Sequence, residues 1–331
     1  MRMLAFTRTL AAALLASIVP GLAGCSTNPA TGERTLALQS WEWERALAAE
    51  AGPQFTEEFG GETPDAGVQG YVDEVGSKLS STAVEQAYAE VPELEWEYTL
   101  LDSAVLNAFA LPGGKVYISR GLAEKLTNEA QLAGVLGHEV GHVMARHGNQ
   151  RISKQTLFNA GLALGAIAVG TADRESAFSQ YGQYAIPALS VGGNVVLLSY
   201  GRDEELEADK LGIQYMVANG YSPEGQRQVM EVLRDAAGGG APPEWLSTHP
   251  ASDTRINRIN EMLDGQYAYT RNNAEYQLYP DRYQQRMLAR LRNLPPAKQQ
   301  EPPQAAGAAG FELANAVTWC AHCAAGAAHH R

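Results

Sequence analysis

Residues 132–148, "LAGVLGHEVGHVMARHG", set two histidines four positions apart in a segment that is otherwise apolar and helical in pattern. Three glycines repeat in this segment, although a glycine inside a helix costs about 1 kcal/mol relative to alanine. At spacings of three and four, Gly134, Gly137 and Gly141 form a smooth strip along one side of the helix. We expect this strip to let the backbone of a neighbouring helix approach closely.

The two histidines, His138 and His142, lie at positions i and i+4, so both imidazoles project from one side of the helix. In that arrangement they can bind a single zinc ion at about 2.0–2.1 Å. Glu139 is badly placed for a third ligand but well placed to take a proton from a zinc-bound water. This HExxH pattern indicates a catalytic zinc site. Taken alone, the two histidines could also belong to a solvated or packed helix face.

A catalytic zinc needs a third protein ligand and an open position for water. Residues 201–216, "GRDEELEADKLGIQYM", supply a candidate, because Glu205 and Asp209 share a helical stripe with small and apolar residues. Carboxylates are costly to bury there unless a partner such as a metal or a metal-bound histidine is present. Glu207 lies on the opposite stripe, which we expect to face solvent. The alternative is that Glu205 is one more surface acid in an acidic run.

The rest of the chain alternates between helical and strand patterns. Residues 94–102 alternate as in a strand, and residues 105–121 contain two strands joined by a turn at 112–114. These patterns predict an α+β fold, mostly helical, with a small mixed β-sheet flanked by helices. Helical patterning begins near Trp41 and is interrupted at 60–61. A second helix is expected from the N-cap Asn128 to about Arg146, with Gly148 as its C-cap. Further helices are expected from about Asp203 to 218–220, after Pro223 and around Arg255.

The first 25 residues have the pattern of a targeting segment. Arg2 and Arg8 precede an apolar run, and "LAGC" then ends at Cys25, which resembles the lipobox of bacterial lipoproteins. We expect lipidation of Cys25 and anchoring of the mature chain, with Ser26 favouring the outer membrane. The alternative is an ordinary signal peptide with a chance cysteine. No run of 18 or more apolar residues follows, so no further membrane span is expected.

Charge and cysteine content narrow the remaining possibilities. The formal net charge of −12 argues against nucleic acid as a partner, because phosphate contacts need a basic surface. Cys320 and Cys323 form "CAHC" near the end of the chain, without a second pair of metal-binding residues. A local disulfide and an unstructured tail are the other interpretations of this segment, and the composition of residues 299–331 favours the unstructured tail.

HExxH, followed about sixty residues later by "ELEAD", resembles the gluzincin zinc metallopeptidases related to HtpX and the CAAX prenyl proteases. "NAFALPGGKVYISRGL" and "STHPASDTRINRI" also resemble that family, and the likeness covers residues 27–262. It implies a zincin-like fold in which Glu205 is the third zinc ligand and Asp209 orients a zinc-bound histidine. With the lipobox, the chain is most similar to the lipid-anchored periplasmic members of the BepA or LoiP type.

The resemblance implies a zinc metalloendopeptidase that cleaves misfolded or stalled envelope proteins. The strand around Asn107 would hold the substrate at a sheet edge, although an ordinary internal strand is the alternative. His249 precedes Pro250 and is expected on a loop. By resemblance it would be a fourth ligand in the resting state that leaves when substrate arrives; the alternative is a merely neighbouring or exposed histidine.

Two other functions fit parts of the pattern. A chaperone-like lipoprotein in outer-membrane protein assembly could use the same groove, but it would have no reason to keep Glu139. A zinc hydrolase acting on other bonds fits the edge strand less well.

The expected organisation of the chain is a signal peptide (1–24), a lipidated N-terminus and tether (25–40), a metallopeptidase domain (41–265), a helical extension (266–298) and a disordered tail (299–331).

Overall fold

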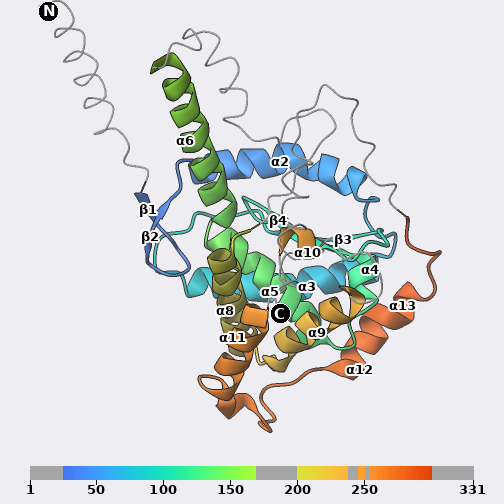
Figure 1. Ribbon diagram of the computed structural model, residues 1–331. Coiled ribbons are helices and arrows are strands. Elements are labelled where there is room, and N and C mark those ends of the chain that lie inside the picture. The colour runs from blue at the N-terminus through green and yellow to red at the C-terminus, as the bar shows by residue number, and fades with distance from the viewer. Residues whose placement is uncertain (1–24, 169–199, 238–244, 250–252, 300–331) are drawn as a thin grey trace, which may run out of the picture. The chain divides into compact units, whose positions relative to one another are not determined.

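The computed structural model of the chain describes residues 25–168, 200–237, 245–249 and 253–299 (Figure 1). A three-stranded mixed sheet lies near its centre, in the order β3-β5-β4. Strand β3 runs parallel to β5, and β4 runs antiparallel to β5. Strand β4 is therefore an edge strand within the described part of the chain. The strands are β3 (Glu97–Leu101), β4 (Ala108–Leu111) and β5 (Lys115–Ser119).

Helices cover both faces of this sheet, as the α+β prediction requires. On one face α2 (Trp41–Glu58) packs Phe55 on Phe109 of β4, with the two ring centroids 5.5 Å apart. On the other face lie α3 (Ala66–Glu85) and α5 (Glu129–Met144), whose apolar residues belong to the main core. Figure 1 shows α2 above the sheet and α3 and α5 below it.

Helix α5 is the central helix, and each of its residues is buried. It begins as predicted, because the Asn128 side chain accepts a hydrogen bond from the Gln131 amide at 3.0 Å. Its end lies two residues before the expected position, and the expected C-cap Gly148 lies inside the next helix instead. Helix α5 stops at Met144, Arg146 takes the left-handed conformation with a φ of 57°, and α6 (His147–Ala168) begins at once. Arg146 is held there by a buried ion pair with Glu44, 2.6 Å away.

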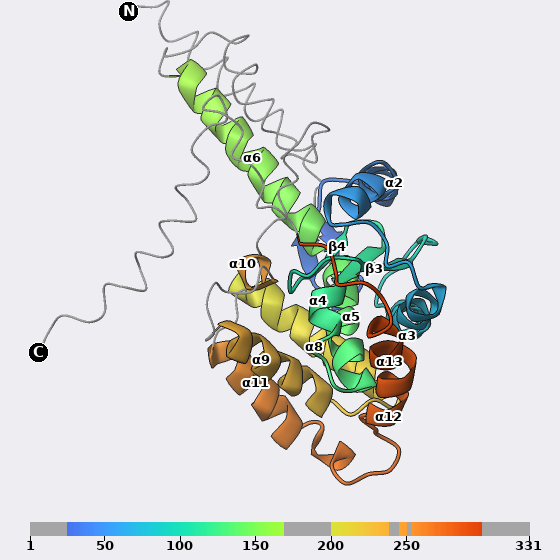
Figure 2. The same cartoon turned by 90° about the vertical axis from the view of Figure 1, so that its right-hand side faces the viewer.

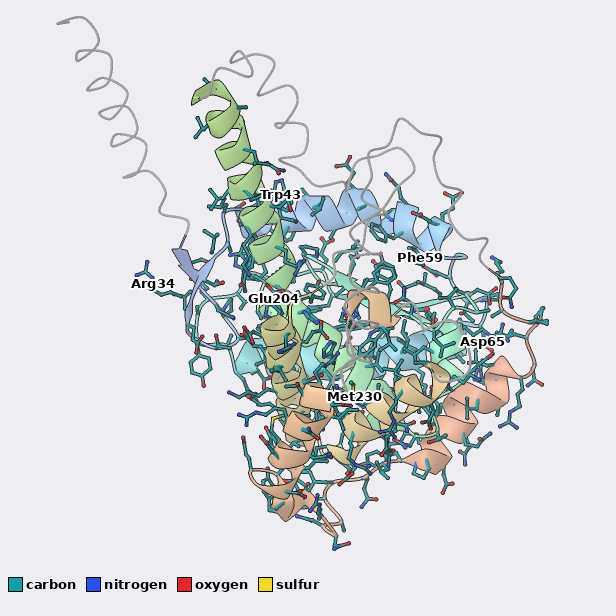
Figure 3. The ribbon with its side chains drawn as sticks, viewed as in Figure 1. Arg34, Trp43, Phe59, Asp65, Glu204 and Met230 are labelled. Atoms are coloured by element: carbon teal, nitrogen blue, oxygen red, sulfur yellow. The ribbon has the colours of Figure 1, made fainter. Side chains whose placement is uncertain are left out.

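Three further helices complete the packing around α5, at or close to the positions that the sequence predicts. They are α8 (Arg202–Ala218), α9 (Glu224–Ala237) and α11 (Asp253–Asp264). Figure 2 shows these helices stacked together on the side away from α2, while α6 extends outward from the body. Met230 of α9 is fully buried in this stack (Figure 3). The stack places the start of α8 against α5, where the candidate site lies.

Short elements join and close this framework. Residues 266–298, expected as an extension, pack on the main core through Tyr283, Met287 and Leu291. The Lys298 carbonyl then accepts a hydrogen bond from the Ala104 amide at 2.9 Å. This segment is therefore part of the same folded unit. Its elements, with the other short helices, are α4 (Arg120–Ala123), α10 (Trp245–Thr248), η2 (Ala268–Thr270), α12 (Pro280–Tyr283), η3 (Gln284–Leu288) and α13 (Ala289–Leu291).

The segment 25–40, expected as a tether, is folded onto the body of the protein. Strands β1 (Cys25–Thr27) and β2 (Arg34–Leu36) pair as an antiparallel hairpin. Asn28, just after β1, is buried and accepts a hydrogen bond from the Ala30 amide at 2.9 Å. This local hydrogen bond stabilises the turn, so a polar segment forms an ordered structure.

Other sequence predictions fall on segments of which the structure says nothing. The expected signal peptide and the tail with Cys320 and Cys323 lie outside the described residues. Among the helices that are described, none combines the length and the apolar character needed to span a membrane.

Candidate active site

Three histidines and one glutamate converge where α5, α8 and the end of α10 meet. They are His138, His142, Glu205 and His249, whose potential metal-binding atoms all lie within 4.8 Å of one another. The two Nε2 atoms of His138 and His142 are 3.1 Å apart. The Glu205 carboxylate lies 3.5 Å from the first and 3.4 Å from the second. All four side chains are buried, so the cluster is a closed group of metal-type donors.

The glycine strip of α5 explains how Glu205 reaches the two histidines. A Cβ atom on Gly137 would lie 3.3 Å from the Gly212 Cα atom of α8, and one on Gly141 would lie 3.2 Å from the Ala208 Cα atom. Side chains at these positions would push α8 away from α5. Gly134 meets Gln226 of α9 in the same way. The predicted role of the strip, a close helix approach, is confirmed.

Asp209 contacts the first histidine from the side opposite the cluster. Its Oδ1 atom lies 3.0 Å from Nδ1 of His138. Burial opposes protonation of His138, but the neighbouring carboxylates of Asp209 and Glu205 outweigh burial and raise its pKa to about 9. The two carboxylates therefore favour positive charge at the position of this imidazole. Asp209 lies where the resemblance requires it, and its role in orienting the histidine stays a prediction.

Arg255 of α11 ties the two carboxylates of α8 together, and the sequence did not single it out. Its guanidinium donates two hydrogen bonds of 2.7 Å to Asp209 and lies 2.6 Å from the Glu205 carboxylate. Burial would raise the pKa of Asp209, but Arg255 outweighs burial and lowers it to about 2. The pKa of Glu205 is also held well below its usual range, so both carboxylates carry negative charge inside the protein. The only sequence signal was the position of Arg255 within "STHPASDTRINRI".

Glu139 points into the same buried space as the cluster. Its Oε1 atom lies 3.6 Å from Nε2 of His249 and 3.5 Å from Nε1 of Trp245. Its Oε2 atom has no hydrogen-bond partner among the described residues. Burial raises the pKa of Glu139 to about 7. A carboxyl group whose pKa lies near neutrality is suited to exchange protons with a reacting group.

His249 is fully buried, so its interpretation as an exposed histidine is wrong. The ring stacks on Trp245, with centroids 4.7 Å apart, and burial lowers its pKa to about 3. The imidazole is therefore neutral and able to donate a lone pair. Its Nδ1 atom is engaged by the Thr248 hydroxyl at 2.9 Å, whereas Nε2, which is near the cluster, lacks a hydrogen-bond partner within the described ranges.

Asn107 lies directly before the edge strand β4, and its side chain is buried. Both atoms of its amide lack hydrogen-bond partners in the part of the chain that the structure describes. Strand β4 also runs beside the cluster, because Ala110 and His142 line one cavity together with Tyr200. Tyr200 stacks on His142 with ring centroids 3.8 Å apart. No spacing in the sequence indicated Tyr200 or Trp245.

Glu207 differs from its prediction. It was expected to face solvent, but only 28% of its side chain is exposed. Its carboxylate accepts a hydrogen bond from the Asn28 side chain at 2.7 Å and lies 3.6 Å from Nε2 of His147. The contact arises because the N-terminal hairpin and the start of α6 pack on this side of α8. Neither contact could be expected from the pattern of α8 alone.

A buried HExxH helix, closely crossed by a helix with the ExxxD pattern, defines a metallopeptidase of the zincin type. The chain belongs to peptidase family M48, whose model matches residues 68–263. The family's metal dependence agrees with the cluster of His138, His142, Glu205 and His249. The expected fold class and the expected metallopeptidase class are therefore confirmed, whereas zinc as the metal stays a prediction.

The chain is similar to proteases of bacteria and to mitochondrial proteases of eukaryotes. The beta-barrel assembly-enhancing protease of Escherichia coli (strain K12) is 32% identical over 203 residues, which cover 58% of this chain and 39% of that protein. The mitochondrial metalloendopeptidase OMA1 of Schizosaccharomyces pombe is 32% identical over 179 residues, covering 54% of this chain and 49% of that protein. The match thus spans less than half the length of either relative.

Proposed function

We propose that this protein is a zinc-dependent endopeptidase of the bacterial cell envelope that hydrolyses internal peptide bonds of misfolded or stalled envelope proteins. The observation that carries the proposal is the buried group of His138, His142 and Glu205 with the carboxyl group of Glu139 beside it, whose Oε2 atom has no hydrogen-bond partner among the described residues. The Escherichia coli relative is named a beta-barrel assembly-enhancing protease, which supports the choice of envelope proteins as substrates.

The donor set supports zinc as the metal. Two imidazole nitrogens and one carboxylate oxygen form a ligand set that catalytic zinc sites use. His249 Nε2 adds a buried donor with no hydrogen-bond partner among the described residues. When bound, zinc supplies Lewis acidity, which lowers the pKa of water and polarises a carbonyl group. His138, His142 and Glu205 would hold the metal, and Asp209 would hold the ring of His138 in place.

Glu139 would carry the proton during hydrolysis. As a carboxylate it accepts the proton of the attacking water, and as a carboxylic acid it returns that proton to the leaving amine. Its pKa, raised to about 7 by burial, suits both directions of transfer. The indole of Trp245 and the ring of His249 border Glu139 and limit the access of bulk water.

The edge strand β4 would hold the substrate. An extended peptide adds to such an edge through main-chain hydrogen bonds, which tolerate many sequences. Ala110 of β4 shares a cavity with His142, so a bound peptide would lie beside the metal site. The side-chain amide of Asn107, which has no hydrogen-bond partner among the described residues, lies at the start of this edge and would supply a further donor and acceptor for the peptide backbone.

Removing the metal should abolish proteolysis and lower the melting temperature. Zinc binds only the folded site, so a free concentration 1,000 times Kd stabilises by about 4 kcal/mol. In a domain of this size each kcal/mol corresponds to roughly 2–4 °C in Tm. We would measure casein cleavage and Tm after dialysis against a chelator and after zinc is restored. Unchanged cleavage by metal-free protein would contradict the proposal.

His249→Ala should raise basal proteolysis while zinc is retained. We propose that Nε2 of His249 occupies the open metal position in the resting state, because it lies within 4.8 Å of the three other donors. Its removal leaves that position free for water. The measurement is casein cleavage by purified variant and wild type, with zinc content as the control. Basal activity at or below wild type with full zinc would eliminate latency and indicate a role for His249 in the reaction.

The envelope location rests on the lipobox and is tested separately. Cys25→Ser should leave the protein unlipidated, since the lipid is the membrane attachment we propose. No nucleic acid partner is proposed, given the net charge of −12. Mass spectrometry of the N-terminus and fractionation of outer membranes would check the anchor. Wild-type protein released from membranes by salt alone would contradict the lipid anchor.

The substrates are identified by a separate experiment, which compares the envelope proteomes of cells with active and with inactive enzyme.

A further inference from the structure

His142 has a partner on the side away from the metal-binding cluster. Its Nδ1 atom lies 2.9 Å from Nδ1 of His147, the first residue of α6. His147 is 1% exposed, and its other ring nitrogen lies 3.6 Å from the Glu207 carboxylate of α8. A row of three side chains therefore leads from His142 through His147 to Glu207.

The left-handed residue between the two helices creates this contact. In a continuous helix His147, five positions after His142, would point about 140° away from it. Arg146 breaks the helix with a φ of 57°, and the ring centroids of His142 and His147 come to lie 5.0 Å apart. A non-glycine residue in this conformation costs free energy and persists where its surroundings hold it. Glu44 holds Arg146 through a buried ion pair.

The direction of the hydrogen bond follows from the metal site. Nε2 of His142 must offer a lone pair to the metal, so the proton of this neutral ring is on Nδ1. That proton is donated to Nδ1 of His147, which leaves the His147 proton on Nε2, toward Glu207. Glu207 is in turn held by the Asn28 amide, which donates to it at 2.7 Å.

We infer that His147 and Glu207 are positioning residues that orient His142 and strengthen it as a metal ligand. The inference rests on the proposed metal site. It gives the two ligand histidines parallel support from α8, since His138 contacts Asp209 directly and His142 contacts Glu207 through His147. The N-terminal hairpin supplies Asn28, the outermost member, so the segment that follows the proposed anchor also supports the metal site.

The test compares zinc affinity of full-length variants at position 147. His147→Leu removes the acceptor, and loss of such a partner typically weakens metal binding by about 10–100-fold. His147→Asn places an amide oxygen near the former Nδ1 and should retain most of the affinity. Zinc Kd is measured by competition with a chelator, and Tm of the metal-free proteins reports folding. Wild-type affinity in the leucine variant, or equal losses in both variants at equal Tm, would overturn the inference.

A second pair of variants, at position 207, tests the same inference if substitutions at the buried position 147 prevent folding. Glu207→Ala should weaken zinc binding, whereas Glu207→Gln keeps an oxygen that accepts from His147 and Asn28. Lys210→Ala, exposed on the same helix, is the matched control and should bind zinc normally. Equal affinity in the alanine and glutamine variants would contradict the role of Glu207. Failure of the wild type to bind zinc would instead refute the proposed function.

Discussion

Glu139→Gln is expected to lower the rate of peptide hydrolysis by about 10²–10⁴-fold, the usual contribution of a general base. The amide keeps the size of the side chain but cannot accept and return the proton. The variant should fold normally, because burial already disfavours the charged form of Glu139 and raises its pKa to about 7. Replacing a buried carboxyl group with a neutral amide therefore removes a desolvation cost.

The experiment measures casein cleavage, zinc content and Tm of purified Glu139→Gln. A matched control is Glu124→Gln, because Glu124 is 42% exposed and pairs only with Arg120 in the described structure. We expect full zinc and wild-type Tm in both variants, with loss of cleavage confined to position 139. Retained cleavage would remove Glu139 from the mechanism. Loss of zinc would show that this residue supports the metal site rather than the proton transfer.

The sequence predicted the elements whose signals are local. The N-cap Asn128, the turn at 112–114 and the end of α8 near Gly220 all depend on a few neighbouring residues, and all occur as expected. The glycine strip is also local, yet it reported a tertiary contact, because a row of glycines has few uses in a helix other than close approach. The strip predicted a close approach by a neighbouring helix, and α8 is the helix that lies against Gly137 and Gly141.

The remaining part of the site depends on contacts between distant segments. Three residues around the site come from different segments of the chain, namely Arg255, Trp245 and Tyr200. Their sequence distances from His138 follow no periodic pattern that would indicate a shared site. The break at Arg146 depends on Glu44, which is 102 positions earlier in the chain. A pattern read along one helix cannot include such partners. For the same reason a continuous helix was expected up to Arg146, and the contact between His142 and His147 was missed.

The N-terminal hairpin shows the same limit for polar segments. Its strands have three residues each, which is too short for a recognisable alternation. Its order comes from burial of Asn28 and from long-range bonds, such as that from the Leu38 amide to the Ser153 hydroxyl at 2.8 Å. Composition alone indicated a tether. A polar segment can nevertheless be ordered when the folded body supplies its hydrogen-bond partners.

Glu205→Ala is expected to weaken zinc binding by more than about 100-fold, and proteolysis should be lost with the metal. Loss of an outer partner of a ligand alone costs about 10–100-fold, and Glu205 would be a direct ligand. The loss of zinc binding should not be caused by unfolding, because the structure shows that a buried partner of Glu205 stays paired. Arg255 loses its contact with Glu205 but keeps both hydrogen bonds to Asp209, so its charge stays paired inside the protein.

Asp203→Ala is the matched control for this prediction, because Asp203 is an exposed acid on the first turn of the same helix. Zinc Kd, casein cleavage and the Tm of metal-free protein are measured for both variants. We expect normal values for Asp203→Ala and a loss of affinity and activity for Glu205→Ala without collapse of its metal-free Tm. Full zinc and activity in Glu205→Ala would exclude Glu205 as a ligand. The third ligand would then have to be His249, the remaining donor within reach of His138 and His142 in the described structure.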